Sequence, residues 1–289
     1  MKETKINFIG KRFIAFIISA VLILGSFGLV ATKGLNFGTD FTGGILMEVH
    51  TPQDANLSEL REKLNSIGVG DVQLQNFGAK DEVLINIAQP EDGEAPAVIK
   101  KVEEILGSQV EYRRTEFVGP KVGSELIKVG ILAVVLSVGA MLVYIWFRFE
   151  WQFGVSAILA LVHDVTITLG LFAVTQMEFN LTTVAAILTI AGYSINDTVV
   201  VFDRIRENIR KYQSMPLIDL LNKSINEMLR RTLLTSITTL IALIALCVFG
   251  GAVIKGFTIA LIFGILIGTY SSVFIASAFL IYLKLKRQS

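Results

Sequence analysis

Two acidic residues, Asp164 and Asp197, interrupt long apolar stretches of the sequence. Asp164 follows His163 near the middle of one stretch, and Asp197 follows Asn196 nearer the end of the next. A charged acid at the centre of a membrane span costs roughly 2.5–3.5 kcal/mol on insertion scales. Acids that are kept despite this cost face other helices or a wet cavity, where they commonly relay protons. Both positions are therefore candidate proton-binding sites.

The stretch around Asp197 has a small and polar face. Thr189, Tyr193 and Asn196 follow one another at spacings of four and three residues, which places them on one side of a helix, and Asp197 comes directly after Asn196. Small and polar side chains on a membrane helix favour contact with another helix. We therefore expect this face to pack inward, toward a neighbouring helix or a wet cavity.

A cationic partner for Asp197 stands at the start of the next apolar stretch. Arg231 is followed at helical spacing by Thr235 and Thr239, which gives that helix a polar face of its own. Burial disfavours an ionised carboxyl, whereas a nearby guanidinium favours it. If the two helices touch, these opposed effects leave Asp197 able to bind and release a proton near neutral pH.

Simpler interpretations of these residues remain open. Asp197 can serve as a hydrogen bond between packed helices, and Arg231 as a basic anchor at the end of a span. For His163 and Asp164, the sequence supports a titrating role and a structural role about equally.

Enzymatic and metal-dependent functions are not expected. An intramembrane aspartyl protease would need two acids in one site and a GxGD motif, but the six residues that end at Asp197 read GYSIND. The two histidines, His50 and His163, lie far apart, and no Cys/His cluster is present. Cys247 is the single cysteine, so no intramolecular disulfide can form, and a net charge of +1 argues against nucleic-acid binding. We expect no metal and no cofactor other than protons as the coupling ion.

The composition is that of a membrane protein. The 289 residues are 53% hydrophobic and 18% charged, where a soluble domain carries about a quarter of charged residues. Six stretches are close to the roughly 20 apolar residues that a span needs, at 13–30, 127–147, 153–175, 181–202, 233–249 and 257–283. The first is longer than the apolar core of a signal peptide, so we expect an uncleaved helix. The fold class is therefore a polytopic α-helical membrane protein.

Basic residues near the span ends predict that both termini are cytoplasmic. They precede the first span, lie in the loops 148–152 and 203–231, and follow the sixth span in a basic tail at 284–289. Residues 1–32 are then a cytoplasmic start with the first span, and 127–283 a five-helix bundle. The remaining segment, 33–126, lies outside the cytoplasm.

This external segment has the pattern of a small α+β domain. Alternation predicts strands at 45–50, 72–77, 82–88 and 110–118. Apolar residues at helical spacing predict a helix after Asn56 and another over 95–106. The order β-α-β-β-α-β matches the ferredoxin-like motif.

Two glycine-containing stretches flank this domain. GTDFTGG precedes the first strand and contains Gly38, Asp40, Phe41, Gly43 and Gly44, whereas GPKVGSEL precedes the second span and contains Gly119, Pro120, Gly123 and Glu125. Such clusters are typical of turns. The alternative is a pair of hinges that let the domain swing.

Two further patterns concern packing. The sixth span has a small residue at every fourth position, namely Gly256, Ala260, Gly264, Gly268, Ser272 and Ala276, which predicts close approach of another helix. Within 203–231, Pro216 and the apolar residues after it predict an amphipathic helix on the cytoplasmic membrane surface.

The flanking stretches, His163-Asp164 and above all residues 192–208 resemble the signature blocks of the SecF family of protein translocase subunits. The resemblance extends over almost the whole chain. It implies an RND-like half that pairs with SecD, works with the SecYEG channel and the SecA ATPase, and uses the proton-motive force to help draw preproteins across the bacterial inner membrane. It also implies that Asp197 and Arg231 take part in proton passage, and that SecD completes the proton site.

One rival function explains a proton site equally well. An RND-type transporter of a small molecule or lipid would also couple transport to protons. The small external domain disfavours it, because efflux pumps of that type carry much larger ones.

Overall fold

The structure is a computed structural model that describes residues 4–66, 68, 72–76, 79–88, 95–107, 110–251, 254–283 and 285. Residues 284 and 286–289 of the expected basic tail, and Phe77 of the second expected strand, lie outside the described residues. The chain forms two compact units. One comprises Met1–Asn36, Val134–Met177 and Thr182–Ser289, and the other comprises Phe37–Ala133 and Glu178–Leu181.

Six segments in the described part of the chain are long and apolar enough to cross a membrane, which confirms the expected fold class. The first five are helices, and a short 3₁₀ turn at Ile9–Lys11 leads into the first. Their bounds are α1 Arg12–Lys33, α5 Pro120–Arg148, α6 Trp151–Thr175, α7 Leu181–Lys211 and α8 Leu217–Phe249. The last span comprises α9 Lys255–Ser271, a π-helical turn at Ser272–Ala276, and α10 Ser277–Tyr282.

The spans differ in how far they are buried. About half of the apolar window is buried in α6, α7 and the last span, at 56%, 50% and 56%. In α1, α5 and α8 the corresponding fractions are 17%, 6% and 11%. The three most buried spans therefore form the core of the bundle, whereas the other three leave most of their apolar windows unburied.

The small residues of the last span let α9 approach α7 closely. A Cβ added at Gly264 would overlap the side chain of Ile190, and one added at Gly268 would lie 3.2 Å from the Cβ of Ser194. Gly170 of α6 packs against Ser26 of α1 in the same way, since an added Cβ would lie 2.6 Å from the Cβ of Ser26. Small side chains thus set the distances between these helices.

The segment expected to form a surface helix is instead the first part of α8, which continues without a break into the fifth span. Its apolar residues Leu220, Leu221 and Ile225 are buried in one cluster with Ile205 of α7. Asn208 donates to Ser224 at 2.9 Å, and Arg204 pairs with Glu227 at 2.6 Å. Since α7 also extends to Lys211, the two helices bury apolar residues against each other, while Ile218 of α8 stays 40% exposed.

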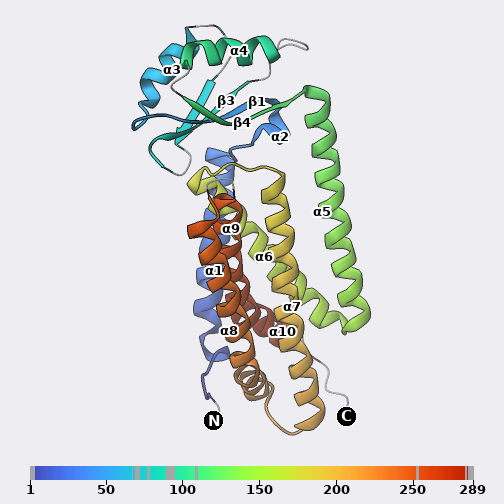
Figure 1. Ribbon diagram of the computed structural model, residues 1–289. Coiled ribbons are helices and arrows are strands. Elements are labelled where there is room, and N and C mark those ends of the chain that lie inside the picture. The colour runs from blue at the N-terminus through green and yellow to red at the C-terminus, as the bar shows by residue number, and fades with distance from the viewer. Residues whose placement is uncertain are drawn as a thin grey trace. The chain divides into compact units, whose positions relative to one another are not determined.

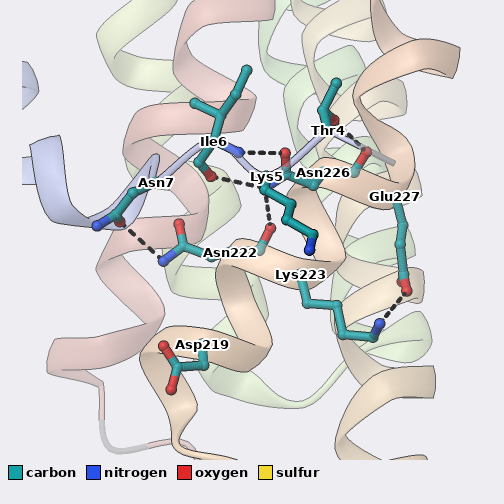
Figure 2. Close-up of a pocket in the computed structure, with 9 residues that line it drawn as sticks. All are labelled: Thr4, Lys5, Ile6, Asn7, Asp219, Asn222, Lys223, Asn226 and Glu227. Carbon is teal, nitrogen blue, oxygen red and sulfur yellow. Dashed lines mark hydrogen bonds and ion pairs between the residues drawn. The ribbon is translucent and has the colours of Figure 1, made fainter. Parts of the chain in front are cut away.

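The N-terminal segment is held on this part of α8 (Figure 2). Asn226 accepts from the backbone N–H of Ile6 at 2.9 Å and donates to its carbonyl at 2.8 Å. Asn222 accepts from the N–H of Ile9 at 3.0 Å. A hollow of about 380 Å³ beside this contact is lined by Lys5, Asp219, Lys223 and Glu227 among others. The N-terminus and the α7–α8 connection therefore lie on the same side of the bundle.

The second unit has the expected ferredoxin-like sheet. Its strands β1 Gly44–His50, β2 Val72–Asn76, β3 Glu82–Ile87 and β4 Glu111–Val118 are ordered β2-β3-β1-β4, and every neighbouring pair is antiparallel. The helices α3 Leu57–Asn65 and α4 Ala95–Leu106 lie together on one face (Figure 1). Asn56 caps α3, accepting from the N–H groups of Ser58 and Glu59. The α3 and α4 side chains close a core with Met47, Ile85 and other buried residues of the strands.

The two flanking stretches differ from the loops expected of them. Residues 39–42 form one helical turn, α2 Thr39–Thr42, which ends at Gly43 and Gly44 with φ angles of 70° and 122°. These angles favour glycine, because L side chains rarely adopt them. The second stretch, from Pro120 onward, is the first part of α5. An added Cβ at Gly123 would lie 3.6 Å from the Asp40 carbonyl oxygen, so the two stretches meet.

We expect Gly264→Ala to destabilise the chain by roughly 1–3 kcal/mol, because the new methyl group overlaps Ile190 in a packed interface. Gly264→Ala should cost less in an Ile190→Ala background than in the unmodified chain, because truncating Ile190 empties the space that the methyl group needs. Gly256→Ala on the same helix is the control, because its Cβ would meet open space. Thermal unfolding of the detergent-solubilised chain measures the effect, and equal losses for Gly264→Ala and Gly256→Ala would contradict it.

Candidate functional site

The Asp197 carboxyl lies in the core of the bundle, where its residue is 8% exposed. It accepts a hydrogen bond from the Ser272 hydroxyl at the start of the π-helical turn. The Arg231 guanidinium acts on it electrostatically, although no ion pair joins the two in the part of the chain that the structure describes. The Thr232 hydroxyl lies near the same carboxyl without hydrogen-bond geometry and has no other partner among the described residues.

Asp164 is the more deeply buried acid, and its residue has no exposed surface. Its Oδ1 lies 2.8 Å from Nδ1 of His163, and its Oδ2 accepts from Ser194 at 2.5 Å and from Ser271 at 2.7 Å. Nε2 of His163 lies 2.9 Å from the hydroxyl of Ser19 on α1. Side chains from four spans therefore converge on this pair.

Adjacent serines connect the two acids to the same short segment of the last span. Ser271 donates to Asp164 and Ser272 donates to Asp197. The π-helical turn begins at Ser272, and the hydroxyl of Ser277 donates to the Ser272 carbonyl at 3.0 Å. Single π-helical turns occur frequently at functional sites, because the wider turn redirects side chains. The two carboxyls accept from different hydroxyls, which does not resemble the shared site of an aspartyl protease.

The remaining residues of the expected polar faces are spread over two environments. Thr189 and Asn196 are exposed on α7, and Thr189 bonds to the carbonyl of Ala185 in its own helix. Thr235 and Thr239 bond to carbonyls of α8 in the same way. Tyr193 is half-buried and donates to Ser236 at 3.3 Å, which in turn contacts Thr269 at 2.7 Å.

Sequence reasoning missed most of the hydroxyl groups that contact the acids. The sequence pattern places Ser272 only in the packing stripe of the last span. It gives no signal that Ser194, Ser271 and Ser19 contact the buried acids. The packing stripe does contain one indication of such a contact, because a serine stands at position 272 where the other members of the stripe are glycine or alanine.

The second unit contains a separate polar cluster around α2. Gly38 and Phe179 are joined by a backbone hydrogen bond of 2.9 Å. Asp40 accepts from the backbone N–H of Leu181, the first residue of α7, at 2.9 Å. An acid at this position also interacts favourably with the helix dipole. Asp40 therefore caps the helix that carries Asp197 farther along.

Glu178 lies against Gly38 in this cluster, and an added Cβ at Gly38 would be only 2.9 Å from its Cδ. Burial raises the pKa of the Glu178 carboxyl, and the nearby Asp40 carboxylate adds to the rise. Arg114 and Asn180 oppose it. Glu178 was not among the residues that the sequence singled out.

Two models of known families match parts of the chain that contain residues of the two clusters. Residues 98–286 match the model of "Protein export membrane protein SecD/SecF, C-terminal", which covers Asp164, Asp197 and the serines. Residues 28–54 match the "SecD/SecF GG Motif", which covers α2 and β1. The chain belongs to the SecD/SecF family.

Individual relatives agree with this assignment. The protein translocase subunit SecF of Vibrio alginolyticus is 46% identical over 290 residues, covering 99% of this chain and 92% of that one. Its counterpart in Rickettsia bellii is 44% identical over 278 residues, covering 95% and 92%. The similarity to these relatives therefore extends over at least 95% of the chain, including all six candidate spans.

Two solved structures share the fold. The crystal structure of SecDF from Thermus, a translocon-associated membrane protein, superposes with a TM-score of 0.89 at 36% identity over 98% of this chain. SecDF in a super-membrane-facing form gives a TM-score of 0.72 at 35% identity. In both cases this SecD/SecF family chain spans 39% of the length of the SecDF chain.

The Glu178 cluster predicts a pH effect at the GG motif. An acid whose pKa is raised by folding stabilises the fold below its unfolded pKa, and that contribution is lost as pH rises through the folded pKa. We therefore expect α2 and the start of α7 to become less protected as pH rises above the ordinary range for glutamate. Glu178→Gln should remove this dependence. Hydrogen exchange of the 38–43 and 181 amides, corrected for intrinsic rates, measures it. Glu111→Gln is the control, because this exposed acid at the other end of β4 does not act on Glu178.

Proposed function

We propose that the chain is the SecF-type subunit of a SecDF protein translocase and that Asp197 is its proton-binding group. The relatives named protein translocase subunit SecF support the first part, because the chain covers 92% of two of them. The proton role is the one that the resemblance to the SecF family implies for Asp197, and the surroundings of its carboxyl support it.

The observation that carries this proposal is the incomplete hydrogen bonding of Asp197. A purely structural buried carboxylate would be expected to have several donors, because leaving a buried charge without partners costs several kcal/mol. Asp197 has the Ser272 hydroxyl, an unbonded Thr232 hydroxyl nearby and a cation that is not in ion-pair contact. Both the charged and the protonated forms therefore have partial support, as a carrier requires.

Proton binding at Asp197 would change how α7 and α8 interact. Neutralising the carboxyl removes its electrostatic attraction for Arg231 on α8. It also weakens the hydrogen bond that the Ser272 hydroxyl donates to this carboxyl. Each proton that moves down about 100 mV of membrane potential yields about 2.3 kcal/mol. An energy of that size is sufficient to shift a two-state equilibrium by a factor of roughly 50.

The helix α7 is continuous from Leu181 to Lys211 and carries Asp197. Asp40 of the GG motif caps its first residue, Leu181. The coupling between proton binding and the second unit would pass along this continuous chain.

The remaining parts of the proposal concern partners and orientation. SecD would supply the part of the SecDF chain that has no counterpart here, including a second intramembrane acid. SecYEG, SecA, the emerging preprotein and membrane lipid are the other expected contacts. Both termini would face the cytoplasm in the bacterial inner membrane. The hydrogen bonds between Ile6 and Asn226 support this for the N-terminal segment, because they hold it against the part of α8 that carries Lys223.

We expect Asp197→Asn to reduce preprotein export to the level seen without a proton gradient, because asparagine keeps the shape of the side chain but cannot exchange a proton. Export into membrane vesicles that contain the chain with SecD, SecYEG and SecA measures this, with and without a proton gradient. Asp203→Asn, on the same helix but exposed and paired with Arg148, is the matched control.

The outcome that contradicts the proposal is a gradient-dependent export rate in Asp197→Asn equal to that of the unmodified chain. An RND-type transporter of a small molecule or lipid would give a different pattern. In that case neither variant would change preprotein export, and the chain would not co-purify with translocon subunits.

A further inference from the structure

The pair formed by His163 and Asp164 has no part in the proton path proposed above. Both side chains are almost fully enclosed, with 3% of the His163 and 0% of the Asp164 side chain exposed. Keeping two titratable groups in an apolar core is costly unless their charges and hydrogen bonds are balanced. The hydrogen bonds around the pair show how that balance is reached.

The hydrogen-bond chain on the histidine side has a fixed direction. It ends at the carbonyl of Ala15, which can only accept, so the Tyr270 hydroxyl donates to it at 2.9 Å. Tyr270 must then accept from Ser19, 3.1 Å away. The single hydroxyl hydrogen of Ser19 is donated to Tyr270, so Ser19 must accept a hydrogen bond from Nε2 of His163, 2.9 Å away. The network thus assigns a hydrogen to Nε2.

The carboxylate side has its own donors. Oδ2 of Asp164 accepts from the hydroxyls of Ser194 and Ser271. Oδ1 faces Nδ1 of His163 at 2.8 Å, a contact that needs one proton between the two atoms. With Nε2 also protonated, the pair is either imidazolium with carboxylate or imidazole with carboxylic acid. Its net charge is zero in both forms.

Neutrality matters because few charged groups face the pair. α1 offers Ser19 and the Ala15 carbonyl, and α9 offers Tyr270 and Ser271. α7 offers Ser194, and the titratable residues next to it on this helix are Tyr193, whose hydroxyl donates to Ser236, and Asp197 three residues farther on. The π-helical turn and α10 contain no charged residue. Loss of the shared proton would leave an unbalanced negative charge on the pair.

We infer that His163 and Asp164 form a second proton-binding site, which holds one shared proton and communicates with Asp197 through Ser271 and Ser272. The inference rests on the proposed function only for its part in export. Proton binding and the link between the two sites stand on the hydrogen bonds alone.

The link depends on a choice of acceptors at each serine. Ser271 lies within hydrogen-bond distance of Asp164 at 2.7 Å and of the Gly268 carbonyl at 3.1 Å. Ser272 similarly reaches Asp197 and the Thr269 carbonyl, the latter at 3.1 Å. A single hydroxyl hydrogen favours the carboxylate when the acid is ionised and can return to its own helix when the acid is protonated.

These two switches are not independent, because the serines are neighbours at the junction between α9 and the π-helical turn. When the Ser271 hydroxyl returns to the Gly268 carbonyl, it shares that acceptor with the backbone N–H of Ser272, whose own carbonyl accepts from Ser277. Protonation of Asp197 therefore changes the donors available to Asp164. The second site would keep the core neutral while Asp197 alternates between its two forms.

Nitrogen NMR of histidine tests the protonation of the pair directly. The chain contains two histidines, so His50→Gln leaves His163 as its single imidazole. The full-length chain, labelled with ¹⁵N-histidine and reconstituted with unlabelled SecD in a bilayer, should show a protonated Nε2 and a proton shared at Nδ1 at neutral pH. An unprotonated Nε2 would overturn the assignment.

The same sample tests the role of Asp164. Asp164→Asn should abolish the shared proton and return His163 to a neutral imidazole, because the carboxyl that holds the proton is gone. Ser156→Ala removes a fully buried hydroxyl from α6 that has no hydrogen-bond partner among the described residues, so it should leave the spectrum unchanged. A spectrum of Asp164→Asn identical to that of the parent would contradict a shared proton.

The link to Asp197 is tested by titrating the His163 signal. Asp197→Asn should shift its midpoint, and Ser271→Ala with Ser272→Ala should reduce that shift. An unchanged midpoint in Asp197→Asn means that the two sites do not communicate. Because this readout needs no export, a failure here is distinct from a failure of Asp197→Asn to lower gradient-driven export.

Discussion

Keeping two carboxyl groups inside an apolar bundle is the constraint on which the arrangement of the spans depends. A buried carboxyl needs hydrogen-bond donors, and in this bundle they are the short hydroxyl side chains of Ser194, Ser271 and Ser272. A serine reaches only a short distance from its backbone, so the helices must lie close together. Glycines at 264 and 268 provide that approach along the α7–α9 contact.

The two acids satisfy this constraint in different ways. Asp164 has a histidine and two hydroxyls as partners and lies fully buried. Asp197 has a single hydroxyl and a guanidinium at a greater distance. A group with complete hydrogen bonding is costly to change, whereas one with partial bonding can alternate between forms. This contrast is the reason for assigning the moving proton to Asp197 and the retained proton to Asp164.

The helix α7 begins in the second unit and continues without a break into the bundle. α7 begins at Leu181, within the cluster of Asp40 and Glu178, and continues past Asp197. The GG motif gains its physical meaning here, since Gly38 leaves space for the Glu178 carboxyl and Gly43 and Gly44 permit the turn before β1.

The sequence by itself determined the six spans, the strands and helices of the ferredoxin-like unit, the family and the identity of the two acids. Periodicity and apolar length are local properties, and a charged residue in an apolar stretch is conspicuous without a structure. Only the tertiary structure decided that Thr189 and Asn196 are exposed, that Leu220, Leu221 and Ile225 pack on α7, and that Ser271 and Ser272 donate to the two acids. These facts depend on which helices touch and at what rotation, and a pattern within one helix does not specify its neighbour.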